Sequence, residues 1–413
     1  GCIFSFFFNI ISSMYNKIVK AKKLINQYII DTPSSFSHSL SESTGKSIFV
    51  KYENKQFTGS FKYRGSLNKL LSLNKDQKKK GVIAMSAGNH AQGLALGCSI
   101  LKVKSTIVMP NNTPFEKIRK NIDYGSNVII HGNNVLESEK YVNQLVSKYG
   151  FIKIHPFDDY EVIHGQGTLM IELLQKHPNL KKIYIPVGGG GLIAGCAVVA
   201  KNINKKIKII GVETENFPSL YNDFYNKNKK FQKSTIAEGV AVNKIGRRNI
   251  SIIKKYVDKT ILVKESSVEK AISMFLLNDK TLVEGAGALG LAAILENDHK
   301  NKNEDVGIIA CGGNLDSRVL SSLLMRELVR KKQVLTLSID MEDKPGQLSE
   351  ISNLCAIEKI NILAVEHSRF TLDLSVRAAR LNITLETQNK KHAEKIIYLI
   401  NKLGFKVKEK KNN

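Results

Sequence analysis

Cysteine is scarce in this chain of 413 residues, and the few that occur are far apart. The five cysteines are Cys2, Cys98, Cys196, Cys311 and Cys355, and no two of them form a CxxC pair. An odd number at such spacing indicates neither a disulfide framework nor a zinc site. We therefore expect a protein of the reducing cytoplasm without a metal site.

Long apolar runs are also missing. The opening GCIFSFFFNII has an apolar run of about nine residues, interrupted by Ser5 and Asn9, whereas a membrane span needs roughly 20. No Lys or Arg precedes the run, as it would in a signal peptide. Met14 begins MYNKIVKAKKLI, which predicts an amphipathic first helix. We expect residues 1–13 to be an upstream extension, with a weak membrane-targeting segment as the alternative.

Positive charge, in contrast, is abundant, and the net charge is +25. A basic face attracts phosphate, so nucleic acid and anionic membranes have to be considered as partners. The lysines are, however, spread along the whole chain in short clusters such as 78–80, 227–230 and 408–411. This distribution favours a solvated surface over a functional basic patch. We expect neither nucleic acid nor membrane as a partner.

From about residue 48 to 330, short β-branched runs alternate with longer helical stretches, which predicts a parallel sheet covered by helices. The expected strands are 47–52, 81–86, 104–109, 127–132, 181–188, 208–213, 260–264 and 306–311. Several of them end in loops rich in glycine or serine. Since ligands bind at the carboxyl ends of strands in open α/β sheets, we expect the functional site there.

The pattern changes after residue 330. The segments that follow predict the order βαββαβ, a ferredoxin-like module of about eighty residues. Its expected strands are 333–341, 361–370, 380–388 and 405–410, and its expected helices are 347–359 and 390–403. A charged stretch at 327–333 predicts a linker, so the module would occupy 334–413.

The stretch TGSFKYRG (58–65) places Lys62 directly after Phe61 in a turn bracketed by glycine and serine, where a helix is expected to begin. A lysine at a helix N-terminus meets an unfavourable dipole. This lowers its pKa and suits an amine that forms a Schiff base. On its own, the motif is also typical of an ordinary junction between a loop and a helix.

The stretch PVGGGGLIAG (186–195) follows a predicted strand and contains Gly188, Gly189, Gly190 and Gly191. Consecutive N–H groups without Cβ atoms form an anion nest, and a helix N-terminus adds positive potential. A tight turn, the alternative, needs only one or two glycines. The four glycines therefore predict a phosphate site.

Three further stretches follow predicted strands or contain glycine patterns. SAGNHAQG (86–93) offers backbone N–H groups for a carboxylate and the amide of Asn89 for a hydroxyl, whereas His90 alone would be structural. ACGGN (310–314) places Cys311 at the end of a buried strand, where a lone cysteine is usually packing. EGAGALG (284–290) contains GxGxxG, but the preceding TLV is too short for a first strand, so we expect no nicotinamide site.

A lysine, a phosphate nest, a carboxylate loop and a neutral pyridine partner are together what a pyridoxal phosphate enzyme requires. ENKQFTGSFKYRG, SAGNHAQG, HPFDDYEVIHGQGT, PVGGGGLIAG and ACGGN, in this order, resemble the threonine ammonia-lyases (threonine dehydratases) of the fold-type II pyridoxal phosphate class. DKPGQL and the βαββαβ tail resemble an ACT domain, a module that senses amino acids. The resemblance implies a catalytic domain at 14–326 built from two open twisted α/β subdomains. The smaller subdomain, about 55–153, would be inserted in the larger one.

The resemblance also implies a role for each matching residue. Lys62 would hold pyridoxal 5'-phosphate as a Schiff base, Phe61 would pack beside its ring, Asn89 would bond its 3-hydroxyl, and Cys311 would meet the pyridine nitrogen. The phosphate would lie against Gly188, Gly189, Gly190 and Gly191. The substrate carboxylate would be received by Ser86, Ala87, Gly88, Asn89 and His90.

These roles imply conversion of L-threonine to 2-oxobutanoate and ammonia by β-elimination of water, and of L-serine to pyruvate. Lys62 would remove the Cα proton, while the neutral thiol of Cys311 would limit delocalisation into the ring. The alternative is a serine racemase or serine dehydratase of the same fold. Racemases carry a second serine where this chain has Ala87 and a polar residue where it has Phe157, which favours the threonine enzyme.

Relatives that bind a divalent cation have an acidic pair after the strand that contains Glu213. This chain has Ser219 at the second position, so we expect no metal. In the ACT-like module, Gly346, Asn361 and Ile362 mark a site for an allosteric amino acid such as isoleucine or valine. A plain oligomerisation module is the alternative. Both interpretations imply a homo-oligomer, either a dimer or a tetramer.

Overall fold

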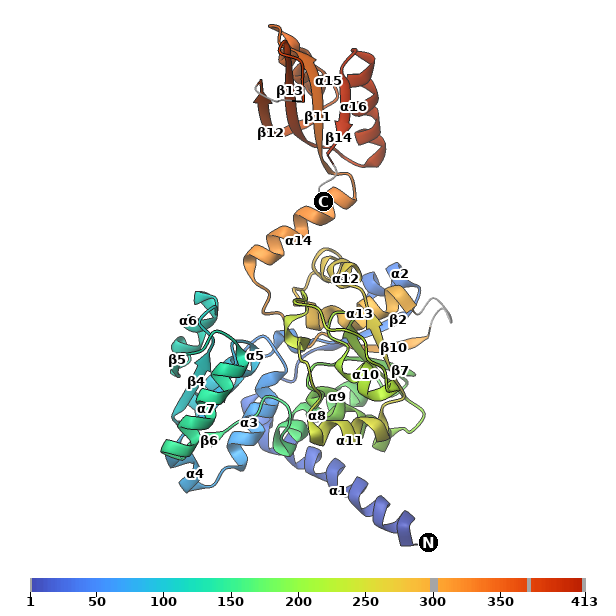
Figure 1. The fold of residues 1–413 in the computed structure, drawn as a ribbon. Coiled ribbons are helices and arrows are strands. Elements are labelled where there is room, and N and C mark those ends of the chain that lie inside the picture. Colours follow the sequence, from blue (N-terminus) through green and yellow to red (C-terminus); the bar gives the residue numbers. More distant parts are fainter. Residues whose placement is uncertain (1, 298–303, 370–372, 411–413) are drawn as a thin grey trace. The chain divides into compact units, whose positions relative to one another are not determined.

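The computed structural model describes residues 2–297, 304–369 and 373–410. The chain forms two compact units, 1–315 and 316–413. The first contains two sheets flanked by helices, and the second contains one sheet (Figure 1). The α/β fold predicted from the sequence, with a ferredoxin-like module after it, is confirmed.

The larger sheet of the first unit has the strand order β1-β2-β10-β7-β8-β9. Its strands are β1 (Ser34–Phe36), β2 (Ser47–Lys51), β7 (Lys182–Pro186), β8 (Lys208–Thr214), β9 (Lys259–Val263) and β10 (Asp305–Ile309). β1 runs antiparallel to β2, and the other neighbours are parallel. The parallel strands end at one edge of the sheet, where the loops after β7 and β10 lie.

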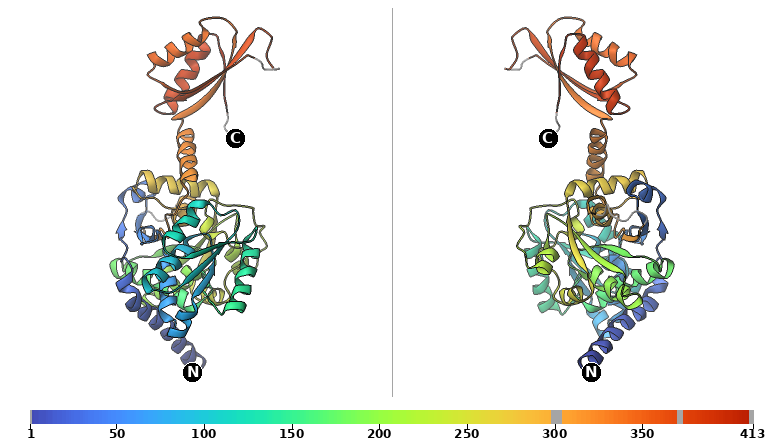
Figure 2. Two further views of the ribbon diagram at one scale, coloured as in Figure 1. Left: turned by 90° about the vertical axis from the view of Figure 1, so that its left-hand side faces the viewer. Right: turned by 90° about the vertical axis from the view of Figure 1, so that its right-hand side faces the viewer.

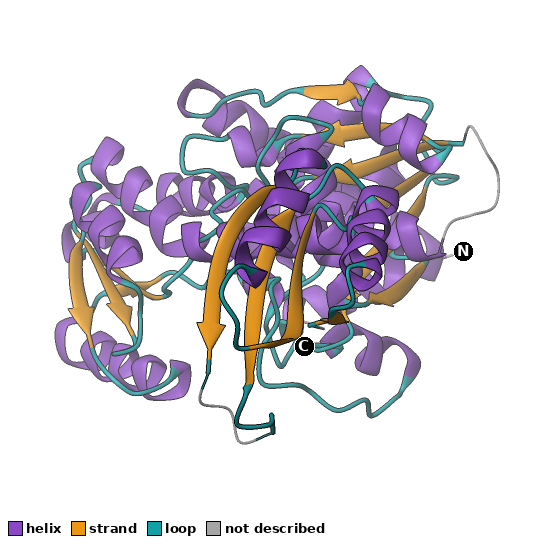
Figure 3. Cartoon of the chain, turned by 90° about the horizontal axis from the view of Figure 1, so that it is seen from above, coloured by secondary structure: helices purple, strands orange, loops and turns teal. Residues whose placement is uncertain are grey.

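The smaller sheet has the order β5-β4-β3-β6, and all its strands are parallel. They are β3 (Val82–Met85), β4 (Ser105–Met109), β5 (Asn127–Ile130) and β6 (Ile152–Lys153). All five residues of β4 are buried, as expected for a central parallel strand. The two sheets lie side by side, each flanked by helices (Figure 3).

Helices connect the strands of the first unit. The helices that precede β6 in the sequence are α1 (Cys2–Ile25), α2 (His38–Thr44), α3 (Lys62–Ser72), α4 (Lys75–Lys80), α5 (Asn89–Leu101), α6 (Phe115–Asp123) and α7 (Val135–Tyr149). The others are α8 (Tyr160–Lys176), α9 (Gly191–Ile203), α10 (Ser219–Tyr225), α11 (Arg247–Tyr256), α12 (Glu265–Leu277) and α13 (Gly285–Asn297). Short 3₁₀ turns are η1 (Asn26–Tyr28), η2 (Glu53–Lys55) and η3 (Glu238–Val240).

Glycines of α8 allow α3 and α9 to pack closely against it. A Cβ atom on Gly165 would lie 2.5 Å from the carbonyl oxygen of Arg64 on α3, and one on Gly167 would lie 2.9 Å from that of Gly195 on α9. Both glycines belong to the stretch HGQGT. Because α3 begins at Lys62 and α9 begins at Gly191, this packing fixes the lysine relative to the glycine loop.

The first helix, α1, runs without interruption through Met14. Of the segment predicted as an extension, Gly1 lies outside the described residues. Ile18 and Ile25 are buried, and the helix packs against α8 and α9. In the part of the chain that the structure describes, no helix is both long and apolar enough to cross a membrane.

The second unit contains a sheet of order β12-β13-β11-β14, in which all neighbours are antiparallel. Its elements are α14 (Ser317–Arg330), β11 (Val334–Glu342), α15 (Gln347–Ile357), β12 (Asn361–Ser368), β13 (Ala378–Glu386), α16 (Lys390–Lys402) and β14 (Lys406–Glu409). Both α15 and α16 lie on one face of this sheet (Figure 2). Leu337, Ile383 and Ile396 are fully buried members of the core between them.

All eight strands predicted before residue 330 are present, and the βαββαβ order of the tail is confirmed. Two strands were not predicted, β1 and β6, because both are short. The segment predicted as a linker, 327–333, begins inside α14. The limits of the domains given above stay a prediction.

Candidate active site

A cavity of about 650 Å³ lies in the first unit, and the residues that line it come from both sheets. The loops after β3, β7 and β10 and the start of α3 all contribute to it. It is lined by Phe61, Lys62, Ser86, Ala87, Gly88, Asn89, His90, Gly188, Gly189, Gly190, Gly191 and Cys311, among others. The structure therefore brings together every residue that the sequence suggested for cofactor and substrate.

Lys62 is the first residue of α3, and its side chain lines the cavity. Nζ donates a hydrogen bond to the carbonyl oxygen of Pro156 at 2.9 Å. Burial lowers the pKa of Lys62 to about 8, although the nearby Cys311 and Glu284 oppose this shift. A lysine with such a pKa has a substantial neutral fraction near pH 7–8, as a nucleophilic amine requires.

The four glycines form the turn between β7 and α9. Gly190 caps α9 with φ +92°, a conformation that favours glycine. A Cβ on Gly189 would lie 2.2 Å from the ring of Phe157, so no larger residue fits there. The side-chain amide of Asn249 donates to the carbonyl oxygen of Gly189 at 2.8 Å and holds the loop from outside. The cradle combines a helix N-terminus with unobstructed backbone, which suits a phosphate.

Cys311 follows β10, and only 2% of its surface is exposed. Burial raises the pKa of its thiol well above the usual value, so the group is neutral. The carbonyl oxygen of Cys311 accepts a hydrogen bond from the N–H of Phe61 at 3.0 Å. This bond connects the segment after β10, which carries the thiol, directly to the residue before Lys62.

The loop after β3 contributes both main chain and side chains. The N–H of Gly88 donates to Oγ of Ser86 at 3.2 Å, which tightens the turn before α5. The imidazole of His90 is buried between Oγ of Ser66 and the carbonyl oxygen of Ile154. Burial and the nearby Lys62 lower the pKa of His90 to about 3, so the ring is neutral. The ring of His90 is therefore occupied by contacts within the protein.

Two polar residues of the site were not predicted from the sequence. The carboxylate of Glu284 accepts from Nδ2 of Asn89 at 2.7 Å, and Nδ2 of Asn314 donates to Oδ1 of Asn89 at the same distance. Glu284 belongs to EGAGALG, where the only pattern recognisable in the sequence is that of the glycines. Residues 279–284 form no strand before α13, as the short TLV predicts.

A fully buried ion cluster lies under the start of α3. The guanidinium of Arg64 donates to Glu53 and to Glu172 at 2.7–2.8 Å. Nζ of Lys51 donates to the same Glu172 at 2.5 Å, and Lys22 of α1 contacts it too. Burial lowers the pKa of Lys51, whereas the two carboxylates hold the pKa of Arg64 above its usual range. This cluster joins α1, α3, α8 and β2.

The residues considered for a cation make other contacts. Glu213 accepts from the N–H groups of Leu220 and Tyr221 at 2.7 Å, and the Ser219 hydroxyl donates to the carbonyl oxygen of Val242. Within the described ranges, no three His, Cys, Asp or Glu side chains gather as they would around a metal ion.

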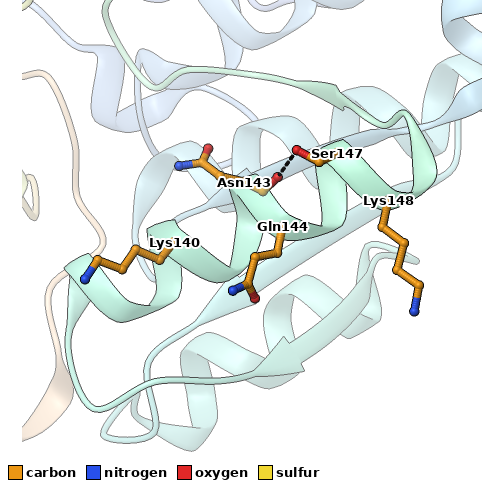
Figure 4. Close-up of a pocket in the computed structure, with 5 residues that line it drawn as sticks. All are labelled: Lys140, Asn143, Gln144, Ser147 and Lys148. Carbon is orange, nitrogen blue, oxygen red and sulfur yellow. Dashed lines mark hydrogen bonds between the residues drawn. The ribbon is translucent and has the colours of Figure 1, made fainter.

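A shallow concavity lies on α7 (Figure 4). It is lined by Lys140, Asn143, Gln144, Ser147 and Lys148, all from one helix. The Ser147 hydroxyl donates to the backbone of Asn143 within the same helix. A surface made from one helix face offers no convergent groups, so we assign it no ligand.

The main cavity fits pyridoxal phosphate, because it combines an amine of lowered pKa, a phosphate cradle without Cβ atoms and a neutral thiol. Residues 25–312 match the family model described as pyridoxal-phosphate dependent enzyme. The chain belongs to this family. Residues 335–405 match the ACT domain model.

Several other members of the pyridoxal-phosphate dependent family are similar over most of the chain. The L-threonine ammonia-lyase of Thermotoga maritima is 38% identical over 95% of this chain and 98% of its own length. A solved threonine deaminase from Solanum lycopersicum has a TM-score of 0.72 and 34% identity, and the match covers 76% of this chain and 88% of that one. A serine racemase from Dictyostelium discoideum has a TM-score of 0.68 and 36% identity over 73% of this chain and 98% of that one.

Proposed function

We propose that this chain is a pyridoxal phosphate-dependent threonine ammonia-lyase. It converts L-threonine to 2-oxobutanoate and ammonia, and L-serine to pyruvate. The observation that carries the proposal is the convergence of Lys62, the glycine loop and Cys311 on one cavity. The similarity to the ammonia-lyase of Thermotoga maritima, which extends through the ACT domain, supports the substrate.

Each group of the cavity has a part in this proposal. When bound, pyridoxal phosphate supplies an electron sink for the negative charge that develops at the substrate Cα. Gly188, Gly189, Gly190 and Gly191 would hold its phosphate, Asn89 its 3-hydroxyl and Phe61 its ring face. The main chain of 86–90 would orient the substrate carboxylate through its N–H groups.

The protonation states of Lys62 and Cys311 determine their roles in the proposed reaction. The Lys62 amine takes the proton from Cα, and its lowered pKa keeps enough of it neutral at physiological pH. The Cys311 thiol is uncharged and so is a weak partner for a ring nitrogen, which disfavours a full positive charge there. More of the negative charge would then stay at Cα, where it promotes breaking of the neighbouring Cβ–O bond, and the hydroxyl group would leave with a proton as water.

The alternative is a serine racemase of the same fold, and the Dictyostelium structure gives it some support. A racemase needs a second proton-transfer group on the opposite face of Cα. Ala87 lines the cavity and cannot transfer a proton. Phe157, whose ring lies over Gly189, is likewise apolar. We therefore expect elimination to dominate.

The test is an absorbance spectrum of the purified protein, followed by addition of L-threonine. We expect a visible band that is absent from Lys62→Ala, and release of 2-oxobutanoate. A band with no keto acid from threonine would contradict the proposed substrate. The same assay with L-serine should yield pyruvate, and appreciable D-serine would favour the racemase.

We also propose the domain limits and the regulation expected from the sequence. The catalytic domain would span 14–326, and an amino-acid effector such as isoleucine or valine would bind the ACT domain. Gly346 caps α15 with φ +95°, and Asn361 and Ile362 begin β12. We further propose that the protein is a homo-oligomer and that it acts in the cytoplasm.

A further inference from the structure

The Asn89 side chain is held by two partners that leave one of its hydrogens unused. Its Oδ1 accepts from Asn314 at 2.7 Å, and Nδ2 donates one hydrogen to Glu284 at 2.7 Å. Because a carboxylate only accepts, Glu284 determines which end of the amide is the nitrogen. The second hydrogen of Nδ2 remains, on a residue that lines the cavity.

Glycines on two different segments make room for this arrangement. A Cβ on Gly312 would lie 2.4 Å from Oε1 of Glu284, and one on Gly59 would lie 2.8 Å from Oδ1 of Asn314. The backbone contributes too, because the N–H of Glu284 donates to the carbonyl oxygen of Gly312 at 3.0 Å. The two glycines and this backbone hydrogen bond therefore fix the positions of Glu284 and Asn314 around the Asn89 amide.

We propose that Glu284 is a positioning residue for the cofactor. Together with Asn314 it fixes the Asn89 amide so that its remaining N–H donates to the ring hydroxyl oxygen of pyridoxal phosphate, and this donation changes as Glu284 gains or loses its proton. The inference rests on the proposed function, in which Asn89 bonds that oxygen.

The charges around Glu284 allow such a change near neutral pH. Burial raises its pKa to about 7, with Asn89 and Lys117 of α6 opposing the shift and Glu238 of η3 adding to it. Lys62 on α3 and Cys311 after β10 also interact with it. Above pH 7 the carboxylate is a strong acceptor, and below pH 7 the neutral acid holds the amide less firmly.

The consequence is visible in the spectrum of the bound cofactor. A hydrogen bond donated to the ring oxygen favours its ionised form. The position of the visible band in the wild type should therefore shift with pH, with a midpoint near pH 7. Glu284→Gln keeps a side-chain oxygen that can accept but cannot titrate. It should lose this shift and bind pyridoxal phosphate about tenfold more weakly.

The experiment compares the full-length wild type with Glu284→Gln between about pH 5.5 and 9. It records the band, the dissociation constant for pyridoxal phosphate and keto-acid release from L-threonine. Glu213→Gln is the matched control, because it changes another buried carboxyl that does not line the cavity. The control should keep the shift near pH 7 and the wild-type affinity.

A second variant keeps the test decisive if Glu284→Gln does not fold. Asn314→Ala removes the other partner of Asn89 but leaves Glu284, so it should weaken cofactor binding severalfold and keep the midpoint near pH 7. The inference is overturned if Glu284→Gln shows the wild-type shift and affinity, or if the folded wild type shows no shift near pH 7. A wild type with neither visible band nor keto acid would instead overturn the proposed function.

Discussion

Lys62 experiences two opposing influences. Burial favours the neutral amine, while the nearby Cys311 and Glu284 favour the charged one, and burial is the larger. The result is a pKa of about 8, compared with 10.5 for an unperturbed lysine. Below pH 8 most of the amine is protonated and cannot attack an aldehyde.

The uptake of pyridoxal phosphate should therefore depend on pH. The rate at which cofactor-free protein forms the visible band should rise with pH and level off above a midpoint of about 8. Stopped-flow absorbance at several pH values measures it. Lys62→Ala should form no such band, and a midpoint above pH 10 in the wild type would contradict the lowered pKa.

Gly189 is the glycine of the loop that tolerates substitution least. In Gly189→Ala, the added Cβ would lie 2.2 Å from the Phe157 ring, so the loop or the ring must move. We expect affinity for pyridoxal phosphate to fall at least about tenfold, equivalent to about 1.4 kcal/mol. Equilibrium dialysis measures the change.

The double variant Gly189→Ala, Phe157→Ala serves as the control, because it removes the clash. It should recover part of the affinity. If the single variant binds as tightly as the wild type, the loop does not hold the phosphate in the way proposed.

Single residues could be predicted from the sequence where they carry the reactive group or form the glycine loop. The residues that hold them in place through hydrogen bonds could not. Lys62 and the four glycines belong to compact motifs that were recognisable in one stretch. Glu284 and Asn314 lie 195 and 225 positions from Asn89 and meet it only in the folded chain. An Asn or Glu in a loop has no local signature that distinguishes such a contact from exposure to solvent.

Among the elements, α3 connects the chemistry to the core. Its first residue is Lys62, and its third, Arg64, is fully buried between Glu53 and Glu172. Glu172 also pairs with Lys51 and Lys22. Without Arg64, however, the buried Glu53 would keep only Lys51, at 4.0 Å, as a positive partner among the described residues, and a poorly compensated buried charge is costly.

Arg64→Met should therefore destabilise the first unit by about 3–5 kcal/mol. Lys69→Met is the matched control, since Lys69 lies on the same helix but its ion pair with Asp159 is partly exposed, and it should cost less than about 1 kcal/mol. Urea unfolding followed by circular dichroism measures both. Similar losses of unfolding free energy in the two variants would contradict the conclusion that the buried ion cluster stabilises the first unit.

The strands illustrate how far a sequence pattern predicts elements. Buried parallel strands such as β4 and β7 are continuous apolar runs between loops, so they were recognised. β1 has three residues and β6 has two, and both lie at a sheet edge. So short a run has no periodicity of its own, and neighbouring strands determine its conformation.

For the whole molecule, the main question is whether the ACT domain regulates the catalytic unit. Gly346 is the residue most suited to a test, because its φ of +95° is strained for any side chain while the space around it is open. Gly346→Ala should distort the start of α15 without unfolding the core of the domain.

We expect Gly346→Ala to reduce the response to isoleucine or valine at least severalfold and to leave the rate without effector unchanged. Keto-acid release at increasing effector concentration measures both quantities. A wild type that responds to neither amino acid would favour the simple oligomerisation module. An unchanged response in the variant would place the effector elsewhere.

The position of Arg64 two residues after Lys62 has a practical consequence for engineering. One helix carries both the amine that would bind the coloured cofactor and a buried arginine that holds the helix in the interior, and the same helix packs closely on α8. Yellow colour in a bacterial colony would then report correct folding and an intact cofactor site together. A library of variants in α1, α3 or α8 could be sorted by eye before any assay of turnover.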